Sequence, residues 1–469
     1  MQTTHIVILG LYLLTMIGIG LYFSRPSKVG GGDDFLFAGR RLPTPVMIST
    51  LLVTWVGSGT IIGGANFAYH HGPFAAMIFS AGTPLGILVL LLIARRIRRA
   101  ARRTVPELLE ARFGTGVRTV AAVVTAVAYV GLVAAQFIGG GYVLALISPL
   151  DATQGALVVA VVVTMLTVTG GLFSVAYTDF VSAIFILGAL LASVPIVFLA
   201  VGGPTAYWEG LPEEATTVGG GLTGLQLLGY FLPLFLLLLA DQNLYQRLAA
   251  AKDERSARNS ALGMLASSFL VFIPVGLLAT SAAILMPGIN GDESILRLAS
   301  EGHLPTVLGG VLLAGAVSFV VTTGSSFMLS AASNIAYDLF ARFGGERVGN
   351  RGTLVVQRVS VVAIAAVAIA IGLYFPTVLD LQMYSYTIYG AAITPAVFAV
   401  LFWKRATTAG AVAALVAGAA TTIGWEVAGA PGDLNGVIVA LPVAVASLVV
   451  VSLLTKAPDP RSLEAAGAD

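Results

Sequence analysis

The chain has 469 residues, of which 57% are hydrophobic and only 10% are charged. A soluble protein carries about 25% charged residues, and a chain this long with so few could not cover several globular domains with a polar surface. A lipid-facing surface needs no such cover. The net charge of +2, without a one-sided basic surface, argues against nucleic-acid binding, and the absence of Cys excludes disulfides, thiolate catalysis and Cys-based metal sites. The composition predicts an integral membrane protein.

A membrane-spanning helix needs about 20 apolar residues, and stretches of that order are separated here by Gly, Pro and charged residues. The sequence predicts an all-α protein with thirteen spans, at 5–23, 46–70, 74–97, 118–146, 154–169, 172–201, 222–249, 259–286, 306–340, 354–378, 383–402, 406–428 and 434–454. The first is not a cleavable signal peptide, because no Lys or Arg precedes it and no A-x-A site follows. We expect one transmembrane domain over residues 1–455 and a short tail at 456–469.

Lys and Arg are distributed unevenly over the loops between these spans. If the N-terminus lies outside, all of the 25 Lys and Arg residues except Arg297 fall on the inner side. By the positive-inside rule, this pattern predicts a multi-pass protein of the cell membrane with its N-terminus outside and its C-terminus in the cytoplasm. The Arg cluster at 95–103 is interpreted as a topology anchor that also meets anionic lipid headgroups.

Two of the predicted spans are interrupted. Span 46–70 has four glycines between positions 57 and 64. Span 222–249 has Pro233 and, further along, three consecutive polar residues at 241–243. Glycine weakens a helix and permits unusual backbone conformations, although small residues also serve close helix packing in membranes. Interrupted helices at matching positions of two halves indicate the binding site of a secondary transporter. If 46–201 and 222–402 are the two halves, both interruptions fall in the first helix of a half.

Span 306–340 carries a cluster of hydroxyl groups, at Ser318, Thr322, Thr323, Ser325, Ser326, Ser330 and Ser333. Ser and Thr in a membrane helix usually bond to their own helix or to a neighbouring one. A dehydrated Na⁺ is a small, hard cation that prefers oxygen ligands. The adjacent hydroxyls of Thr322 and Thr323, together with carbonyls freed in a broken span 46–70, could therefore hold Na⁺ without any formal charge.

Four carboxylates lie in or near the spans: Asp179, Asp241, Asp338 and Glu426. An acid within a membrane is functional by default, because burying it without a partner is costly. Asp241 fits this description best, whereas Asp338 and Glu426 are expected to be interfacial and solvated. Two interpretations of Asp241 stay open: recognition of a cationic group, or a structural acid that bonds backbone groups at a helix break.

Five separate motifs resemble the sodium:solute symporter family. They are TWVGSGTIIGGANFAY in span 46–70, GGLFSVAYTDFVS at 170–182, DQNLYQR at 241–247, TTGSSFMLSAASNIAYDLF at 322–340 and PAVFAVLFWKRATTAGAVAALVAG at 395–418. The resemblance implies the inverted-repeat fold of the leucine-transporter type, with one extra N-terminal helix, a five-plus-five core and two C-terminal helices. It also implies Na⁺-driven uptake by alternating access.

Carried over to this sequence, the resemblance implies a Na⁺ site made of the carbonyls of Val53, Val56 and Phe319 and the hydroxyls of Thr322 and Thr323. Asp179 matches the family's TD motif on the inner side of the ion path. The polar residue that often follows three positions later, typically Gln, is Ser182 here.

The nearest branch resembles the choline transporters, in which a quaternary ammonium is held by aromatic faces. Trp55 matches one wall of such a cage, but Asp241 stands where another wall would be Trp, so the cage is incomplete. The predicted substrate-binding residues are Trp55, Gly57, Thr60, Gln136, Asp241, Gln242, Asn243 and Tyr384.

The sequence therefore predicts Na⁺-coupled symport of a small organic solute into the cell. Its expected partners are the solute, Na⁺ and the lipid bilayer, with no nucleic acid and no obligatory protein partner. The alternatives are a proton-coupled transporter that uses Asp241, or a transporter-like membrane sensor. An enzyme is not expected, because no set of nucleophile, base and orienting residue is present.

Overall fold

A computed structural model describes residues 2–23, 42–100, 104–169, 172–341, 350–375 and 377–458. Within these ranges the secondary structure is helical, apart from one isolated parallel bridge between Leu42 and Ala251. Of the predicted tail, residues 459–469 lie outside the described residues, as do positions 170 and 171 of one motif. The same holds for the predicted inner-loop residues Arg25, Lys28, Arg40, Arg41, Arg102, Arg103, Arg342, Arg347 and Arg461.

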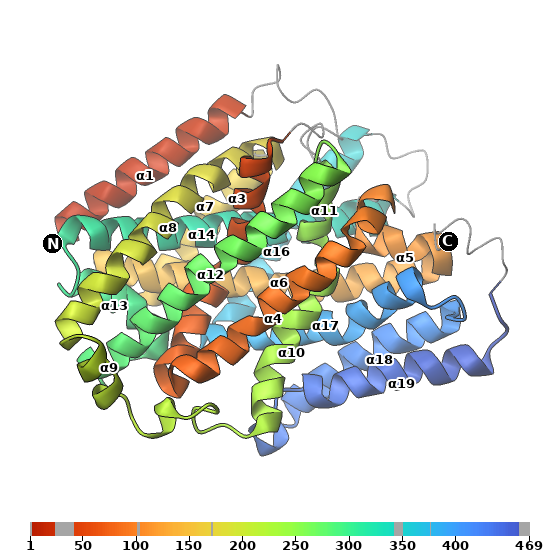
Figure 1. Ribbon diagram of the computed structural model, residues 1–469. Coiled ribbons are helices and arrows are strands. Elements are labelled where there is room, and N and C mark those ends of the chain that lie inside the picture. The colour runs from red at the N-terminus through yellow and green to blue at the C-terminus, as the bar shows by residue number, and fades with distance from the viewer. Residues whose placement is uncertain are drawn as a thin grey trace.

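The described helices form one bundle (Figure 1). In order they are α1 (Gln2–Phe23), α3 (Thr44–Trp55), η2 (Gly59–Gly63), α4 (Gly64–Ala100), α5 (Val105–Phe113), α6 (Thr115–Ile147), α7 (Ala152–Thr169), α8 (Leu172–Val201), α9 (Pro204–Gly210), η3 (Glu214–Thr216), α10 (Gly224–Ala240), α11 (Gln242–Ala250), α12 (Glu254–Leu285), η4 (Gly291–Glu293), α13 (Ser294–Ser300), α14 (Thr306–Ser333), η5 (Asn334–Phe340), α16 (Asn350–Gly372), α17 (Val378–Phe402), α18 (Thr408–Val427), η7 (Pro431–Asp433) and α19 (Val437–Leu454).

Ten helices in the described part of the chain are long and apolar enough to cross a membrane, and three further apolar helices are shorter. One of the ten, Gly59–Ile93, contains two crossings, because the chain turns back at Gly72 (φ 80°, ψ 177°) just before Pro73 (Figure 1). Its first arm continues the short helix α3 after a break and completes one span with it. The thirteen predicted spans are therefore present.

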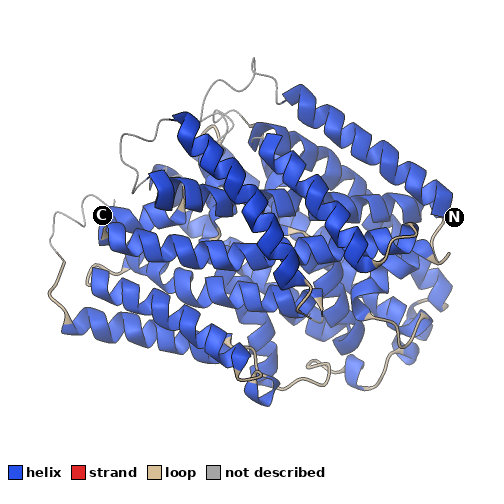
Figure 2. Ribbon diagram, turned by 180° about the vertical axis from the view of Figure 1, so that it is seen from behind, coloured by secondary structure: helices blue, strands red, loops and turns tan. Residues whose placement is uncertain are grey.

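The spans form two sets of five, each of which opens with a broken helix. The first set is α3 with η2 and the first arm of α4, then the second arm of α4, α6, α7 and α8; the second is α10 with α11, then α12, α14, α16 and α17. Outside these sets, α1 packs against α8 and α14, and α18 and α19 pack against each other and against α17. Seen from behind, the described part of the bundle consists of helices joined by loops (Figure 2).

The centre of the bundle is formed by α6, α14 and α17. In the most apolar window of Thr306–Phe340, 83% of the residues are buried inside the protein, against 28% for Val437–Leu454. Large apolar side chains such as Leu92, Leu199 and Leu454 remain exposed on the outer helices, as expected for a surface that faces lipid.

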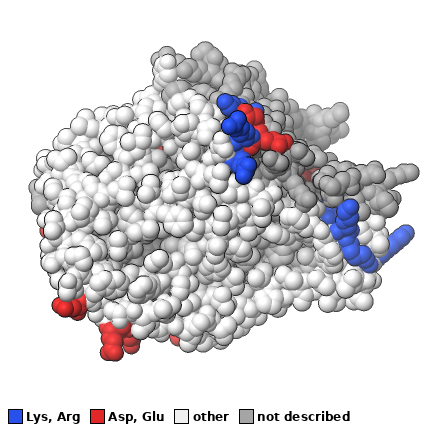
Figure 3. All heavy atoms as spheres, in the orientation of Figure 1, with Lys and Arg blue, Asp and Glu red and all other residues white. Residues whose placement is uncertain are grey.

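Charged side chains gather at the two ends of the bundle (Figure 3). On the face shown there, Lys and Arg lie together with some Asp and Glu at the end where α12 begins, and Asp and Glu alone lie at the opposite end, beside α9 and the loop that follows it. The long flank between these ends is uncharged on this face. This is the distribution that a membrane-spanning bundle requires.

Candidate functional site

The first broken span comes apart directly after Trp55. The N–H of Val56 still bonds to the carbonyl of Leu52, but Val56 itself is extended (φ −84°, ψ 91°), and the π-helix η2 begins at Gly59. A Cβ on Gly57 would come within 2.7 Å of Gln136 Oε1 and 2.8 Å of Thr323 Cγ2, and a Cβ on Gly59 would overlap the carboxamide of Gln382. Glycine at these positions lets α6, α14 and α17 approach the break closely.

The residues predicted to bind Na⁺ meet at this break. Thr323 Oγ1 on α14 donates a hydrogen bond to the Val53 carbonyl on α3 over 2.9 Å, and Thr322 Oγ1 lies 3.3 Å from the Phe319 carbonyl oxygen. All five predicted ligands, Val56 included, are buried. No group of three or more His, Cys, Asp or Glu side chains that could hold a metal occurs among the described residues. The oxygens gathered here are neutral, which fits a singly charged hard cation.

A buried charged pair lies one turn away along α3. Thr50 Oγ1 donates to Asp179 Oδ2 over 2.6 Å, and the guanidinium of Arg247 on α11 lies 4.0 Å from the same oxygen. Arg247 also donates to Thr50 and to Ser326 Oγ, at 3.1 Å and 2.9 Å. Arg247 was expected to be an inner-loop charge, which is wrong because it lies in α11 and its side chain is only 2% exposed. The position of Arg247 within the DQNLYQR motif was the available signal.

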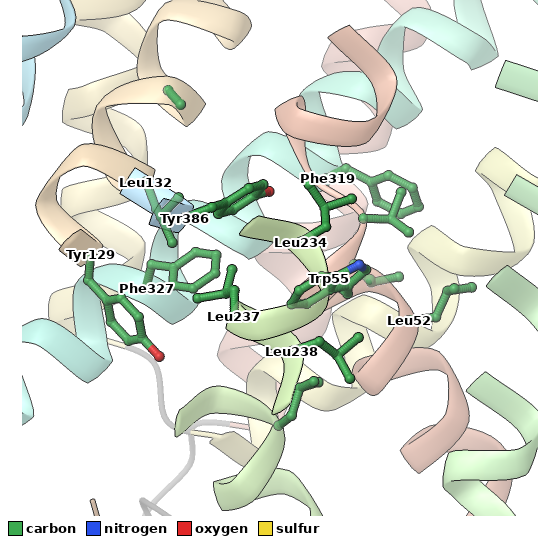
Figure 4. Packing of buried hydrophobic residues seen from close by; sticks show 14 of the residues in the cluster. Leu52, Trp55, Tyr129, Leu132, Leu234, Leu237, Leu238, Phe319, Phe327 and Tyr386 are labelled. Carbon is green, nitrogen blue, oxygen red and sulfur yellow. The ribbon is translucent and has the colours of Figure 1, made fainter. Parts of the chain in front are cut away.

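A small cavity of about 20 Å³ opens on the other side of the break, between α3, η2, α4, α10, α12 and α17. The indole of Trp55 stacks on Tyr386, with ring centroids 6.4 Å apart and an interplanar angle of 8°, and donates from Nε1 to Thr83 Oγ1 over 2.9 Å. Figure 4 shows these two rings with Leu234 beside them. The described lining residues are uncharged: Trp55, Gly59, Thr60, Gly64, Ala76, Phe79, Ser80, Leu234, Phe272, Val275, Gly276 and Tyr386.

The structure brings some of the predicted substrate-binding residues to this cavity and places others elsewhere. Trp55 and Thr60 line it, and Gly57 lies at the break against Gln136. Tyr384 does not line the cavity as described, and its ring instead packs against Phe375 at 5.6 Å. Tyr386, two residues further along α17, lines it and was missed.

The three consecutive polar residues at 241–243 lie at the start of α11. Asp241 is the N-cap of this helix: its Oδ1 accepts from the Leu244 N–H over 2.8 Å, and its Oδ2 accepts from the Tyr129 hydroxyl over 3.0 Å. Gln242 Oε1 accepts from the Val105 N–H, and Asn243 Oδ1 accepts from Ser330 Oγ. None of the three belongs to the described lining of the cavity. For Asp241, this geometry matches the structural interpretation.

A second expectation, about the exposure of Asp338, is also wrong. It was expected to be solvated at the interface, but it is 0% exposed. Arg118 Nε donates to Asp338 Oδ1 over 2.7 Å, and Thr104 Oγ1 donates to the same oxygen over 3.0 Å. Partners on other helices therefore hold this acid inside the protein, whereas Glu426 is exposed as expected.

At the end of the bundle near α9, Asp292 in η4 joins three elements. Its Oδ1 accepts from Asn66 Nδ2 on α4 over 2.7 Å, and its Oδ2 accepts from the Val378 N–H at the start of α17 over 2.9 Å. Burial raises the pKa of Asp292, although both hydrogen bonds oppose the shift. This contact joins η4 to the first arm of α4 and to the start of α17, and it was not foreseen, because Asp292 lies in a loop with other acids.

Known transporters resemble this chain over nearly its whole length. The chain is 25% identical to the osmoregulated proline transporter OpuE and 26% identical to the high-affinity proline transporter PutP, both of Bacillus subtilis (strain 168). The alignments cover 98% and 94% of this chain, and 96% of each relative. A solved structure of a Na⁺-coupled sialic acid symporter, in a substrate-bound outward-open state, superimposes with a TM-score of 0.81 at 18% identity, covering 97% of this chain and 99% of that one.

The predicted fold of the leucine-transporter type is confirmed by this structural likeness. The relatives described here are named for proline, and the resemblance to the choline-transporter branch is not confirmed. Residues 35–418 match the model of the Sodium:solute symporter family, whose members are secondary transporters rather than enzymes. This match spans well over half of the chain, which therefore belongs to the sodium:solute symporter family.

Proposed function

We propose that this protein binds Na⁺ where α3 meets α14 and carries a small solute from the cavity beside Trp55 into the cell. The observation that carries the proposal is the hydrogen bond from Thr323 to the Val53 carbonyl, which joins the two helices at the broken span. Backbone oxygens at such a break and hydroxyls on a facing helix are the donors that transporters of this architecture use for Na⁺.

The coupling is proposed to act through the break itself. Val53 and Val56 would contact the ion, and Trp55, which lies between them in the sequence, lines the cavity. An ion that fixes the carbonyls on either side of Trp55 also fixes the position of its ring. Na⁺ binding would therefore order one wall of the solute cavity, and loss of Na⁺ to the inside would loosen it.

The direction of transport is proposed from the charge distribution. With the N-terminus outside and the C-terminus in the cytoplasm, inner loops carry nearly all of the Lys and Arg residues. Entry of one Na⁺ then gains about 2.3 kcal/mol for each 100 mV of membrane potential, which is available to drive solute uptake. We propose that residues 46–201 and 222–402 are the two halves that move against each other, and that Asp179 lies on the inner ion path.

The solute to test first is L-proline, because the relatives OpuE and PutP are named as proline transporters. Purified protein would be reconstituted into vesicles, and uptake of radiolabelled L-proline and a panel of amino acids, sugars, amines and monocarboxylates would be measured under an inward Na⁺ gradient. We expect uptake of one solute class that disappears when K⁺ replaces Na⁺. Uptake that follows a proton gradient without Na⁺ would overturn the proposal in favour of proton coupling.

A further inference from the structure

A stripe of polar side chains runs along α14 and its continuation η5, away from the break in the first broken span. Its residues recur at every fourth position and are all buried: Thr322, Ser326, Ser330, Asn334 and Asp338. Side chains at this spacing lie on one face of a helix, one above the other. The stripe therefore leads from the proposed Na⁺ site at Thr322 to a carboxylate in the π-helix η5, a type of helix that is frequent at functional sites.

Asn334 has no partner in this stripe. Both polar atoms of its side chain, Oδ1 and Nδ2, are buried and make no hydrogen bond within the part of the chain that the structure describes. Asp338 Oδ2 and Asn243 Nδ2 are buried and unpaired in the same way. Leaving a buried donor or acceptor unpaired is costly, so these four atoms indicate a place that a ligand completes.

Contacts on either side of Asn334 show what encloses it. One turn before it, Ser330 Oγ donates to Asn243 Oδ1 on α11 over 2.6 Å. One turn after it, Asp338 Oδ1 accepts from Thr104 Oγ1, just before α5, over 3.0 Å. The start of α5 also meets α11, since the first N–H of α5 donates to the first side chain of α11 over 3.1 Å. Asn334 therefore lies in an enclosed place between η5, α11 and the start of α5.

The charges beside Asn334 favour a cation over an anion. Asp338 and Glu110 both pair with the guanidinium of Arg118, so two carboxylates share one positive charge. Arg118 and Thr104 bond only Oδ1 of Asp338, which leaves Oδ2 for a further partner. A cation at Oδ2 would balance the excess negative charge, whereas an anion would be repelled.

We infer that Asn334 Oδ1 and Asp338 Oδ2 form a second Na⁺ site, separate from that of Thr322 and Thr323. This inference rests on the proposed function, to which it adds a position that the ion occupies on its way to the cytoplasm. Amide and carboxylate oxygens are ligands that hard cations prefer. Water that the ion retains accepts from the free N–H groups of Asn334 and Asn243, so a hydrated Na⁺ pairs all four atoms.

Arg247 on α11 keeps the two positions apart. Its guanidinium donates to Ser326 Oγ, which lies on the stripe between Thr322 and Asn334. At the rise of an α-helix, these two residues are about 18 Å apart. A guanidinium repels Na⁺, so passage from one position to the other requires α11 to move. The second position can therefore be filled and measured by itself.

Binding of radioactive Na⁺ to the purified full-length protein, measured by scintillation proximity in N-methyl-D-glucamine buffer, tests the inference. The variant with Thr322→Ala and Thr323→Ala lacks the hydroxyls of the first site, so the Na⁺ that it still binds reports the second. In this background, Asn334→Leu should weaken the remaining binding at least about tenfold, because one oxygen ligand is lost. Gln357→Leu is the matched control, since this buried amide bonds Ser333 instead, and it should leave the remaining binding unchanged.

Asn334→Asp distinguishes a lost ligand from a misfolded protein. This change keeps the size of the side chain and replaces its amide by a carboxylate, so the remaining Na⁺ binding should tighten about tenfold, a gain that misfolding does not produce. Remaining binding that responds to neither substitution at Asn334 overturns the inference. So does the absence of any Na⁺ binding in the variant that lacks both threonine hydroxyls.

The same measurements separate this inference from the proposed function. If Thr322→Ala with Thr323→Ala binds Na⁺ as well as the wild-type protein does, the proposed ion site fails, and the variants at Asn334 still decide the inference. If the threonine changes remove part of the Na⁺ binding and the changes at Asn334 alter none of the rest, the proposed ion site stands and only the inference fails.

Discussion

The hydroxyl of Thr323 on α14 donates a hydrogen bond to the carbonyl oxygen of Val53 on α3, with 2.9 Å between the oxygens. The two residues are 270 positions apart in the sequence and come from different halves of the bundle. Val53 lies in the last turn of α3, where carbonyls lack partners within their own helix. A hydroxyl that reaches such a carbonyl brings two oxygens together in a neutral, buried place, which is the setting for Na⁺ binding.

The first prediction concerns this pair of helices. Replacing both Thr322 and Thr323 with Ala removes two hydroxyl oxygens and keeps a residue that suits a helix. The Na⁺ concentration for half-maximal uptake should rise about tenfold or more, which corresponds to about 1.4 kcal/mol of binding free energy. Ser193→Ala is the control, because that buried hydroxyl bonds only its own helix, at Ala189. An unchanged Na⁺ dependence in vesicles would reject the site.

A second prediction tests the close approach at the break. Gly59→Ala should reduce transport by at least about tenfold, because its Cβ would overlap the Gln382 carboxamide in a tightly packed interior. The double variant Gly59→Ala with Gln382→Ala removes the overlap and should recover folded yield above that of the single variant. Fluorescence size-exclusion chromatography measures the yield. Without any recovery in the double variant, the contact between the two residues is not what requires glycine at position 59.

The sequence carried enough information for the architecture and for the contact between α3 and α14 at the break. Apolar stretches long enough to cross a membrane predicted the spans, because length and composition alone identify a membrane-spanning helix. Glycines at 57 and 59 marked the break, since few residues other than glycine let neighbouring helices come so close. Adjacent hydroxyls at Thr322 and Thr323 marked the facing helix.

The residues that line the cavity were harder to predict, because they lie on helices that are buried on nearly every face. Tyr384 and Tyr386 are separated by about 200° around α17, so only one of them can face the cavity. Nothing in the apolar pattern of this helix distinguishes them, since most of its residues are buried. The burial of Asp338 depends on Arg118, 220 residues away, a pairing that no local pattern reveals.

Arg112 gives a third prediction, on stability. Its guanidinium donates to the carbonyl oxygens of Ala399, Val400 and Trp403 at the end of α17, at 2.5, 3.1 and 2.6 Å. Arg112→Ala removes these charge-assisted hydrogen bonds from buried carbonyls, of which Ala399 and Trp403 keep only their backbone partners, and should lower the stability of the folded protein by about 1–3 kcal/mol. Thermal melting in detergent checks this. Arg405→Ala, which removes bonds to the more exposed carbonyls of Leu453 and Thr455, should cost less; an equal loss would contradict the prediction.

The contact of Asp292 with Asn66 and Val378 gives a prediction about pH. Burial raises the pKa of Asp292, so the state in which η4 is docked on α4 and α17 binds a proton more tightly than a state in which Asp292 is solvated. Acidification should therefore favour the docked state, and pH above the raised pKa should disfavour it. Asp292→Asn, which is neutral at every pH, should behave like the wild-type protein in acid.

Because the chain has no Cys, a single Thr60→Cys change reports access to the cavity through its rate of labelling by a water-soluble thiol reagent. The measured quantity is this labelling rate with Asp292 intact, divided by the rate in the Asp292→Asn variant, so that the effect of pH on the thiol itself cancels. The ratio should exceed one at neutral pH and approach one in acid. Glu301→Gln, which removes a pair with Arg297 and is not among the charges that act on the pKa of Asp292, should leave the ratio unchanged. A ratio that rises in acid would refute the linkage.

The last prediction concerns Asp241, whose two carboxylate oxygens accept from the Leu244 N–H and the Tyr129 hydroxyl. An N-cap carboxylate of this kind stabilises the start of its helix by about 0.5–2 kcal/mol. Asp241→Asn keeps one acceptor oxygen, so the Leu244 bond can persist while the bond from Tyr129 weakens. We expect the folded yield to fall moderately and the transport rate per folded molecule to stay within about threefold of the wild-type rate. Asp241→Ala should lower the yield further. Binding and folded yield measured side by side decide between the two roles, because abolished binding of amines by a well-folded Asn variant would show that Asp241 recognises the solute instead.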